Sequence, residues 1–408
     1  MKETPKNRCG AKSQALRESA STLIPAAVHA AYPPWPATAA GPPAFSKAKG
    51  AVLTDIDGND YVDYCCGYGA LILGHADERV TVAVNKALSK GCAYAALSEA
   101  EVRLAELIVS RYASIDMVRF DNSTGDAIRT AIGLASAYTG RRHLVQLGSH
   151  HDSGTEALAA PYNDIAAVET LFAERGTQIA AILVEPASIS LGLTLPSEGF
   201  LPGLRRLCDT HGALLVFDES TVGLRITAGG ASAVYSVIPD LVVLGPVLGG
   251  GLPLTACGGR RDIMSRATQS LGQRFLGHPA PSPAALAAGI ATLQAVGEPE
   301  FYTDLQTKSV RLAEGLQGVI AAAVVKARIS YVNSIIGIFF ADPNKESSAP
   351  TRSSNVGLAA YFFDAMLNRG VFLTPSQQPI MFLTAAHTDA QIDDTIEAVH
   401  AVLADAPL

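Results

Sequence analysis

The sequence has little lysine, and its lysines are placed unevenly. Ten occur among 408 residues, at positions 2, 6, 12, 47, 49, 86, 90, 308, 326 and 345. None lies between Gly91 and Thr307, an interval of about half the chain. Because a lysine amine is needed to form a Schiff base with a carbonyl compound, residues of this interval cannot form one. Only a lysine from a terminal segment or from a partner subunit could supply that chemistry there.

Other absences exclude whole classes of protein. No window reaches the roughly 18 uncharged apolar residues of a membrane span, and the first 20 residues contain no apolar signal-peptide core. We therefore expect a cytoplasmic protein that does not contact a membrane. The formal net charge is −7, and basic residues cluster no more densely than the pair Arg141 and Arg142. Nucleic acid is not an expected partner.

The cysteines give no sign of a metal centre. Six are present, at positions 9, 65, 66, 92, 208 and 257, and none of the spacings is that of a metal-ligand pair. So few cysteines in so long a chain are typical of reduced thiols rather than of a disulfide framework. We predict no metal site.

Short apolar runs dominate the middle of the chain and indicate the fold class. Residues 144–147, 180–184, 214–217 and 241–244 are such runs, with helical patterns or loops between them. This alternation predicts an α/β fold with a mostly parallel sheet. We expect three segments: residues 1–65 as an N-terminal segment and hairpin belonging to a small domain, 66–300 as a large α/β domain, and 301–408 as a smaller α+β part. The first 20 residues or so are expected to be a weakly ordered leader.

Three motifs at the ends of these runs carry a family resemblance. They are Val184-Glu185-Pro186, Phe217-Asp218-Glu219, and Leu244-Gly245-Pro246 followed by the triple glycine at 249–251. With them the chain, from about residue 23 to 403, resembles the class III aminotransferases of the fold type I pyridoxal-phosphate (PLP) enzymes, most of all their glutamate-1-semialdehyde 2,1-aminomutase branch. In that family the residue between Leu-Gly and the glycine turn is the lysine that holds PLP. Here it is Pro246, which has no side-chain amine.

The resemblance implies a set of cofactor-binding residues. Ser123, Thr124 and Gly125 match the loop that binds the PLP phosphate at a helix N-terminus. Asp218 matches the aspartate that pairs with the pyridine nitrogen, and Glu185 of the intact Val-Glu-Pro motif is counted with the cofactor-binding residues. A helix cap at Ser123 and a strand-end carboxylate at Asp218 would explain the same residues without a cofactor, so both interpretations stay open.

Several positions depart from the family pattern. His150 takes the place of the tyrosine that stacks on the cofactor, and His278 that of the threonine by which a partner subunit binds the phosphate. The candidates for acid–base catalysis are accordingly His150, His151, Glu219 and His278, because histidine titrates near neutral pH and carboxyl groups can be shifted toward it.

Three functions therefore stay open. The first is a diverged enzyme that acts on a small biosynthetic intermediate by acid–base chemistry without an internal aldimine, and is neither a transaminase nor an aminomutase. The second is an aminotransferase-like enzyme that binds PLP or its amine form (PMP) noncovalently. The third is a catalytically silent binding or partner subunit. The resemblance also implies a homodimer.

Overall fold

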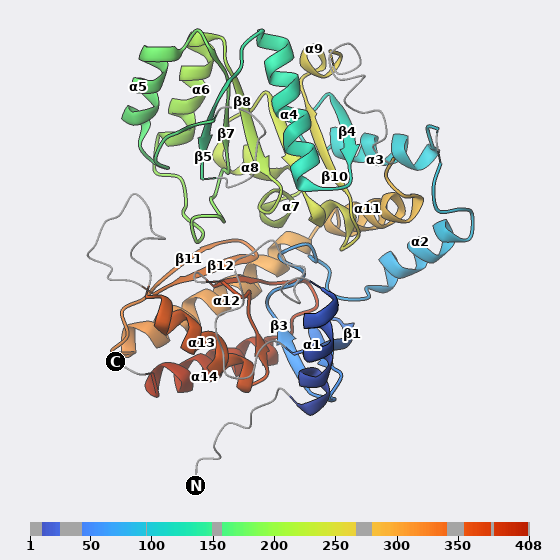
Figure 1. Ribbon diagram of the computed structural model, residues 1–408, viewed down its shortest axis with the longest axis vertical. Coiled ribbons are helices and arrows are strands. Elements are labelled where there is room, and N and C mark those ends of the chain that lie inside the picture. The colour runs from blue at the N-terminus through green and yellow to red at the C-terminus, as the bar shows by residue number, and fades with distance from the viewer. Residues whose placement is uncertain are drawn as a thin grey trace. The chain divides into compact units, whose positions relative to one another are not determined.

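The computed structural model describes residues 10–24, 43–94, 96–148, 157–266, 280–340, 355–376 and 379–406. The chain divides into two compact units (Figure 1). We call Gly69–Ile72 with Glu78–Tyr302 the sheet unit, and Met1–Tyr68 with Leu73–Asp77 and Thr303–Leu408 the terminal unit. Within the described residues, no helix is long and apolar enough to cross a membrane.

The sheet unit contains a seven-stranded sheet in the order β4-β10-β9-β8-β7-β5-β6. The strands are β4 (Met117–Asp121), β5 (His143–Leu147), β6 (Ala157–Ala159), β7 (Ile179–Val184), β8 (Leu214–Glu219), β9 (Leu241–Leu244) and β10 (Thr255–Gly259). Neighbouring strands from β9 to β6 are parallel, whereas β10 is antiparallel to both its neighbours. The predicted α/β fold with a mostly parallel sheet is confirmed.

Helix α4 (Thr124–Thr139) crosses one face of this sheet (Figure 1). Its buried side chains pack on Leu214 and Val216 of β8 and on Leu241 and Val243 of β9. Because side chains alternate between the two faces of a strand, the residues between these face away from α4. We call the two sides of the sheet the α4 face and the opposite face.

The other described helices of the sheet unit lie before β4, between the strands and after β10. They are α2 (Glu78–Leu88), α3 (Glu99–Val109), α5 (Ile165–Arg175), α6 (Phe200–His211), α7 (Gly223–Ile226), α8 (Gly230–Tyr235), η2 (Pro246–Gly249), α9 (Arg261–Met264) and α11 (Pro283–Val296). Helix α11 is apolar on nearly all sides and is buried along its length, with α2 and α3 packed against it.

The terminal unit is built from both ends of the chain. One sheet has the order β1-β2-β3-β13 and the other β11-β12-β14. Their strands are β1 (Phe45–Lys49), β2 (Val52–Asp55), β3 (Asp60–Asp63), β11 (Arg328–Val332), β12 (Ile335–Phe339), β13 (Val371–Phe372) and β14 (Ile380–Phe382). The terminal unit also contains the helices α13 (Val356–Asn368) and α14 (Asp389–Ala404). Helix α12 (Phe301–Ala322) belongs to it except for its first two residues.

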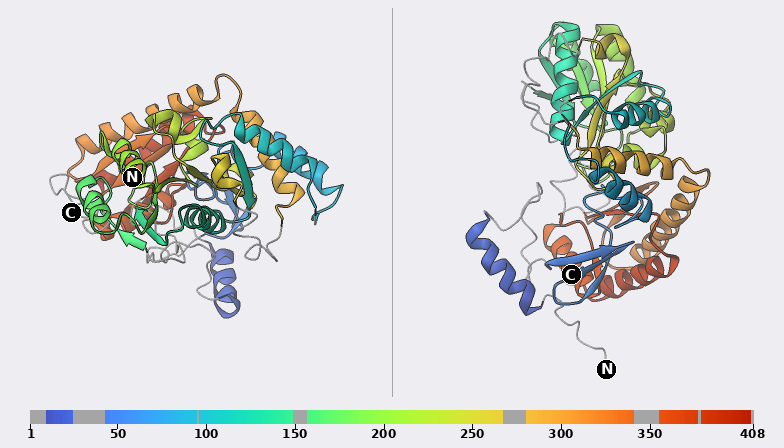
Figure 2. Two further views of the ribbon diagram at one scale, coloured as in Figure 1. Left: turned by 90° about the horizontal axis from the view of Figure 1, so that it is seen from above. Right: turned by 90° about the vertical axis from the view of Figure 1, so that its right-hand side faces the viewer.

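The expectation of a weakly ordered leader is wrong for part of the first 20 residues. Ala11–Leu23 forms helix α1, which Figure 2 shows attached to its unit at one end. The carboxylate of Asp57, in the turn of the predicted hairpin, accepts the amides of Lys12 and Ser13 at 3.0 Å each and the Ser13 hydroxyl at 2.6 Å. The sequence could not reveal this helix start, because its capping carboxylate lies more than 40 positions away.

Candidate functional site

The cofactor-site candidates lie at one edge of the sheet unit. Strands β7, β8 and β9 run parallel and end there, and β4, separated from β9 by β10, ends at the same edge where α4 begins. Ligands of open α/β sheets bind at the carboxyl ends of the strands. Glu185, Asp218 and the Gly245-Pro246 pair stand at this edge, together with Ser123 at the start of α4.

Asp218 is buried on the α4 face, with 2% of its surface exposed. Alternation along β8 places it on the same side as Leu214 and Val216. Its Oδ1 accepts the Ser220 amide at 3.1 Å. The carboxylate therefore lies on the side of the sheet that α4 covers, where a ligand approaching the helix start would meet it.

Glu185 directly follows β7 and lies beside Asp218 on the α4 face. Val184 pairs with Phe217 in the parallel ladder, so the next residues of both strands are neighbours. The Oε2 of Glu185 accepts the Ile189 amide at 2.6 Å and the Ser190 amide at 3.2 Å. Burial, and then the charge of Asp218, raise the pKa of Glu185 to about 7.

The start of α4 offers the amide groups that the phosphate-site prediction requires. Ser123 is the N-cap residue: its hydroxyl accepts the Asp126 amide at 3.2 Å and donates to the Asp126 carboxylate at 2.6 Å. Thr124 and Gly125 follow as the first helical residues, whose amides point out of the helix end. Arg129 pairs with Asp126 and offsets its charge. The Thr255 hydroxyl, donating to the Ser123 carbonyl at 2.9 Å, fixes this corner to β10.

The predicted turn after β9 is present, and it begins with a close backbone contact. A Cβ at Gly245 would lie 1.9 Å from the carbonyl oxygen of Ser220, so no side chain fits there. Pro246 is half-buried and opens η2, a position for which proline is preorganised. The described part of the chain contains no cis peptide bond. Gly250 and Gly251 adopt positive φ values of 57° and 98°, which explains the need for glycine in this turn.

Glu219 does not join the other described candidates. As the next residue along β8, it faces away from α4. Its Oε2 accepts the Ala231 amide at 3.0 Å, and Oε1 has no hydrogen-bond partner among the described residues. The side chain packs against Tyr112 and Gly230, and burial raises its pKa to about 8. Its catalytic role stays a prediction without support from its position.

The three histidine candidates, His150, His151 and His278, lie outside the described residues, so their roles also stay predictions. Gly148 is the last described residue before His150 and His151, and its carbonyl accepts a hydrogen bond from the Ser190 hydroxyl. Ser190 thus links the Glu185 loop to the end of β5. Sequence reasoning missed Ser190, in the loop after β7, and Thr255, the first residue of β10, because single serine and threonine residues carry no distinctive signal. Their proximity to Val184-Glu185-Pro186 and to the glycine turn was the only available hint.

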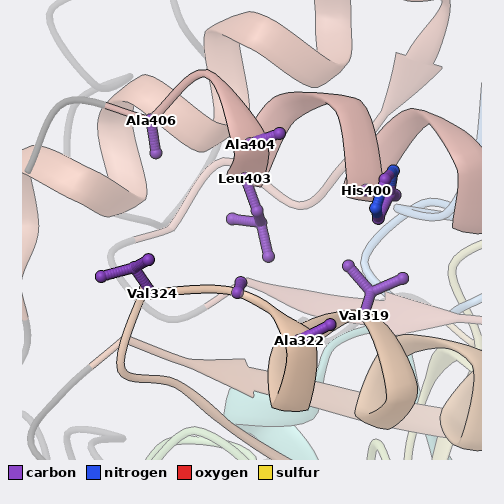
Figure 3. A pocket seen from close by; sticks show the side chains of 8 residues that line it. Val319, Ala322, Val324, His400, Leu403, Ala404 and Ala406 are labelled. Atoms are coloured by element: carbon purple, nitrogen blue, oxygen red, sulfur yellow. The ribbon is translucent and has the colours of Figure 1, made fainter.

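A pocket of about 170 Å³ lies elsewhere, in the terminal unit (Figure 3). It is formed where the ends of α12 and α14 meet, and apart from His400 its lining is apolar. The lining residues are Val319, Ala322, Ala323, Val324, His400, Leu403, Ala404 and Ala406. None of the predicted site residues lines it, so we do not assign it to the site.

The chain matches the class-III aminotransferase family over residues 37–160 and 149–403. It belongs to this family. Its relatives include the glutamate-1-semialdehyde 2,1-aminomutase of Desulforamulus reducens, 39% identical over 95% of this chain and 96% of the relative. The glutamate-1-semialdehyde 2,1-aminomutase of Desulforudis audaxviator is 38% identical over 95% of this chain and 96% of the relative. The predicted family resemblance is confirmed.

Solved structures agree with this assignment. An omega-transaminase from Sphaerobacter thermophilus superimposes with a TM-score of 0.87 and 28% identity, over 98% of both chains. A glutamate-1-semialdehyde aminomutase from Pseudomonas aeruginosa has a TM-score of 0.89 over 98% of this chain and 95% of that one, at 21% identity, and so shares the fold. The predicted PLP-transferase fold of type I is confirmed.

The described residues can be compared with what a pyridoxal cofactor of this family needs. A buried carboxylate, Asp218, stands on the α4 face, and a helix start with outward amides stands at the same edge. These groups suit the ring nitrogen and the phosphate respectively. The sheet unit has lysines only at 86 and 90, in and just after α2. The described residues therefore fit the ring nitrogen and the phosphate of a pyridoxal cofactor.

Proposed function

We propose that this class III family member works without a covalent bond between cofactor and lysine. It acts on a small biosynthetic intermediate by acid–base chemistry, in the cytoplasm, and is neither a transaminase nor an aminomutase. The observation that carries the proposal is the lysine-free interval from Gly91 to Thr307, with Pro246 where the resemblance places the family lysine. Removal of a nucleophile usually costs many powers of ten in rate, so ordinary transamination is not expected.

The chain's own groups suggest how protons could be moved. The Asp218 carboxylate would hold and orient a cationic nitrogen of the ligand at the end of β8. Glu185, whose pKa is raised to about 7, can gain or lose a proton near neutral pH. His150, His151 and His278 are the further candidates for proton transfer. Because Glu219 faces away from α4, we give it no step here.

A second candidate function has its own support. In it, PLP or PMP binds noncovalently, with Asp218 at the ring nitrogen and the amides of Ser123, Thr124 and Gly125 at the phosphate. When bound, the cofactor would supply an electron sink for reactions of amino compounds. A solved aminomutase from Pseudomonas aeruginosa, a lysine-to-alanine variant, is in complex with PMP. That structure is 22% identical with a TM-score of 0.90, so the likeness is one of fold.

A homodimer is part of the proposal. Several large apolar side chains are exposed on α2, on α3 and on the segment between them. Soluble monomers seldom expose so much apolar surface on neighbouring elements. The exposed side chains are Val82 (59% exposed), Leu88 (45%), Leu97 (79%), Val102 (45%) and Val109 (37%). A second copy of the chain would bury them.

The experiment that tests the proposal combines an assay with a binding measurement. The purified protein is mixed with PLP and common amino donors, and absorbance is followed for a half-reaction, which we expect to be absent. PMP binding is then measured by calorimetry for the wild type and for Asp218→Asn, with Glu198→Gln as a surface-carboxylate control.

The possible results separate the candidates. Loss of roughly tenfold in PMP affinity for Asp218→Asn, about 1.4 kcal/mol, with no change for the control, supports the noncovalent cofactor. No PMP binding at all removes that candidate and leaves acid–base chemistry or a silent subunit. A robust half-reaction contradicts the first candidate.

A further inference from the structure

Glu185 and Asp218 form a pair of buried carboxyl groups on one face of the sheet. Parallel pairing of Val184 with Phe217 sets the residues that follow them side by side. Neighbouring strands lie about 4.8 Å apart, so the two side chains meet above the same face. Only 8% of Glu185 and 2% of Asp218 is exposed.

Hydrogen bonds and burial have opposite effects on the ionisation of Glu185. Glu185 is fixed through one carboxylate oxygen, Oε2, by the Ile189 and Ser190 amides. Burial raises its pKa to about 7 and the charge of Asp218 adds to the effect, although the Ser190 and Ile189 hydrogen bonds oppose it. A buried carboxyl group beside a second carboxylate ionises less readily, so Glu185 retains its proton to about neutral pH.

Tyr162 is a further titratable group near Glu185. Its hydroxyl donates to the backbone carbonyls of Glu185 and Pro186 at 3.1 Å each. Burial raises the pKa of Tyr162 well above its ordinary value, so it stays neutral where Glu185 titrates. Of Glu185 and Tyr162, Glu185 is thus the group whose charge changes near neutral pH.

We propose that Glu185 is a positioning residue that acts through Asp218. The pair shares one proton below neutral pH, and loss of this proton gives the site a second negative charge that strengthens binding of a ligand with a cationic ring nitrogen. The part concerning the ligand rests on the noncovalent PLP or PMP function proposed above. The part concerning the shared proton does not depend on that proposed function.

The first test needs no ligand. Infrared difference spectra of the full-length protein are recorded across about pH 6 to pH 9, where a buried protonated carboxyl gives a carbonyl band that disappears on ionisation. We expect a titrating band near neutral pH that is missing in Glu185→Gln, and a separate band near pH 8 from Glu219 that remains in this variant and disappears in Glu219→Gln. In Asp218→Asn the near-neutral band should titrate at lower pH, because the neighbouring negative charge is gone. A near-neutral band unchanged in Glu185→Gln, or its midpoint unmoved in Asp218→Asn, overturns the shared proton.

The second test uses PMP as the probe. Its dissociation constant is measured across the same pH range for the wild type and Glu185→Gln, so that the ligand's own titration cancels in the ratio. We expect the dissociation constant of Glu185→Gln divided by that of the wild type to be near one at the acidic end. This ratio should rise roughly fivefold or more as Glu185 of the wild type ionises. Glu198→Gln, on the surface, should follow the wild type.

The two tests fail separately. A ratio that stays flat while PMP binds overturns the role of Glu185, because a merely structural residue would weaken binding equally at every pH. If PMP binds to the wild type at no pH, the proposed cofactor function fails, and the ligand part of this inference fails with it. The infrared spectra then still decide whether the pair holds one proton.

Discussion

Glu219 is the residue whose environment most clearly opposes ionisation. It is 2% exposed, one carboxylate oxygen has no hydrogen-bond partner among the described residues, and burial raises its pKa from 4.5 to about 8. The folded protein therefore binds this proton more tightly than the unfolded chain. Its contribution to stability is complete below about pH 4.5 and is lost as pH rises toward about 8.

Replacing Glu219 by Gln should remove this pH dependence, because the amide keeps the shape and cannot ionise. We expect the free energy of unfolding of the wild type to fall relative to Glu219→Gln by up to about 1.4 kcal/mol per pH unit in that window. Urea unfolding at several pH values measures it, with Glu198→Gln as an exposed control. Parallel curves for wild type and Glu219→Gln would contradict the assignment.

Motifs in the sequence could identify Asp218 and Glu185, because each follows a recognisable apolar run. Strand alternation alone could also have separated Glu219 from Asp218, since successive residues face opposite sides. The pairing of Glu185 with Asp218 could not be foreseen, because it depends on which strands are neighbours and on their register. His150, His151 and His278 stay predictions from the family resemblance.

At the scale of the elements, the junction of β9 with η2 requires a residue without a side chain at Gly245. A Cβ at Gly245 would meet the Ser220 carbonyl, which is backbone and cannot rotate away. We expect Gly245→Ala to lower the free energy of unfolding by roughly 1–3 kcal/mol, as overpacking does. Denaturant midpoints measure the change.

A matched glycine elsewhere supplies the control. Gly318 lies within α12, and a Cβ there would meet nothing within 4 Å. Gly318→Ala should therefore stabilise the protein by roughly 0.5–1 kcal/mol through helix propensity. If both substitutions changed stability alike, the close contact at Gly245 would not be the cause.

Most elements of the central sheet could be predicted, because buried parallel strands read as continuous apolar runs. The run at 241–244 coincides with β9, and the run at 214–217 falls two residues short of the end of β8, because Asp218 and Glu219 are not apolar residues. Helix α1 could not be predicted, since Asp57 of the hairpin turn caps its start. Local sequence holds no trace of such a distant cap.

At the scale of the whole molecule, the exposed apolar residues of α2 and α3 favour association with a second copy. We expect the wild type to have the mass of a dimer in solution. Leu97→Asp combined with Val102→Asp should yield monomers, because charges would be buried unpaired at the interface. Light scattering coupled to size exclusion measures both masses.

The control for this prediction is an apolar residue in the terminal unit that is equally exposed. Val324 is 78% exposed at the pocket of Figure 3, and Val324→Asp should leave the mass unchanged. A monomeric wild type, or a double variant that stays dimeric, would contradict the proposed surface. The homodimer was expected only from the resemblance, since exposure cannot be read from sequence.

The central claim is that the protein does not bond covalently to PLP, and borohydride reduction followed by intact mass and peptide mapping tests it most directly. The wild type, incubated with PLP and reduced, should carry no stoichiometric pyridoxyl phosphate on any one of its ten lysines. Pro246→Lys restores an amine at the position matching the family lysine, and should gain one adduct there. A full equivalent on a single wild-type lysine would contradict the account.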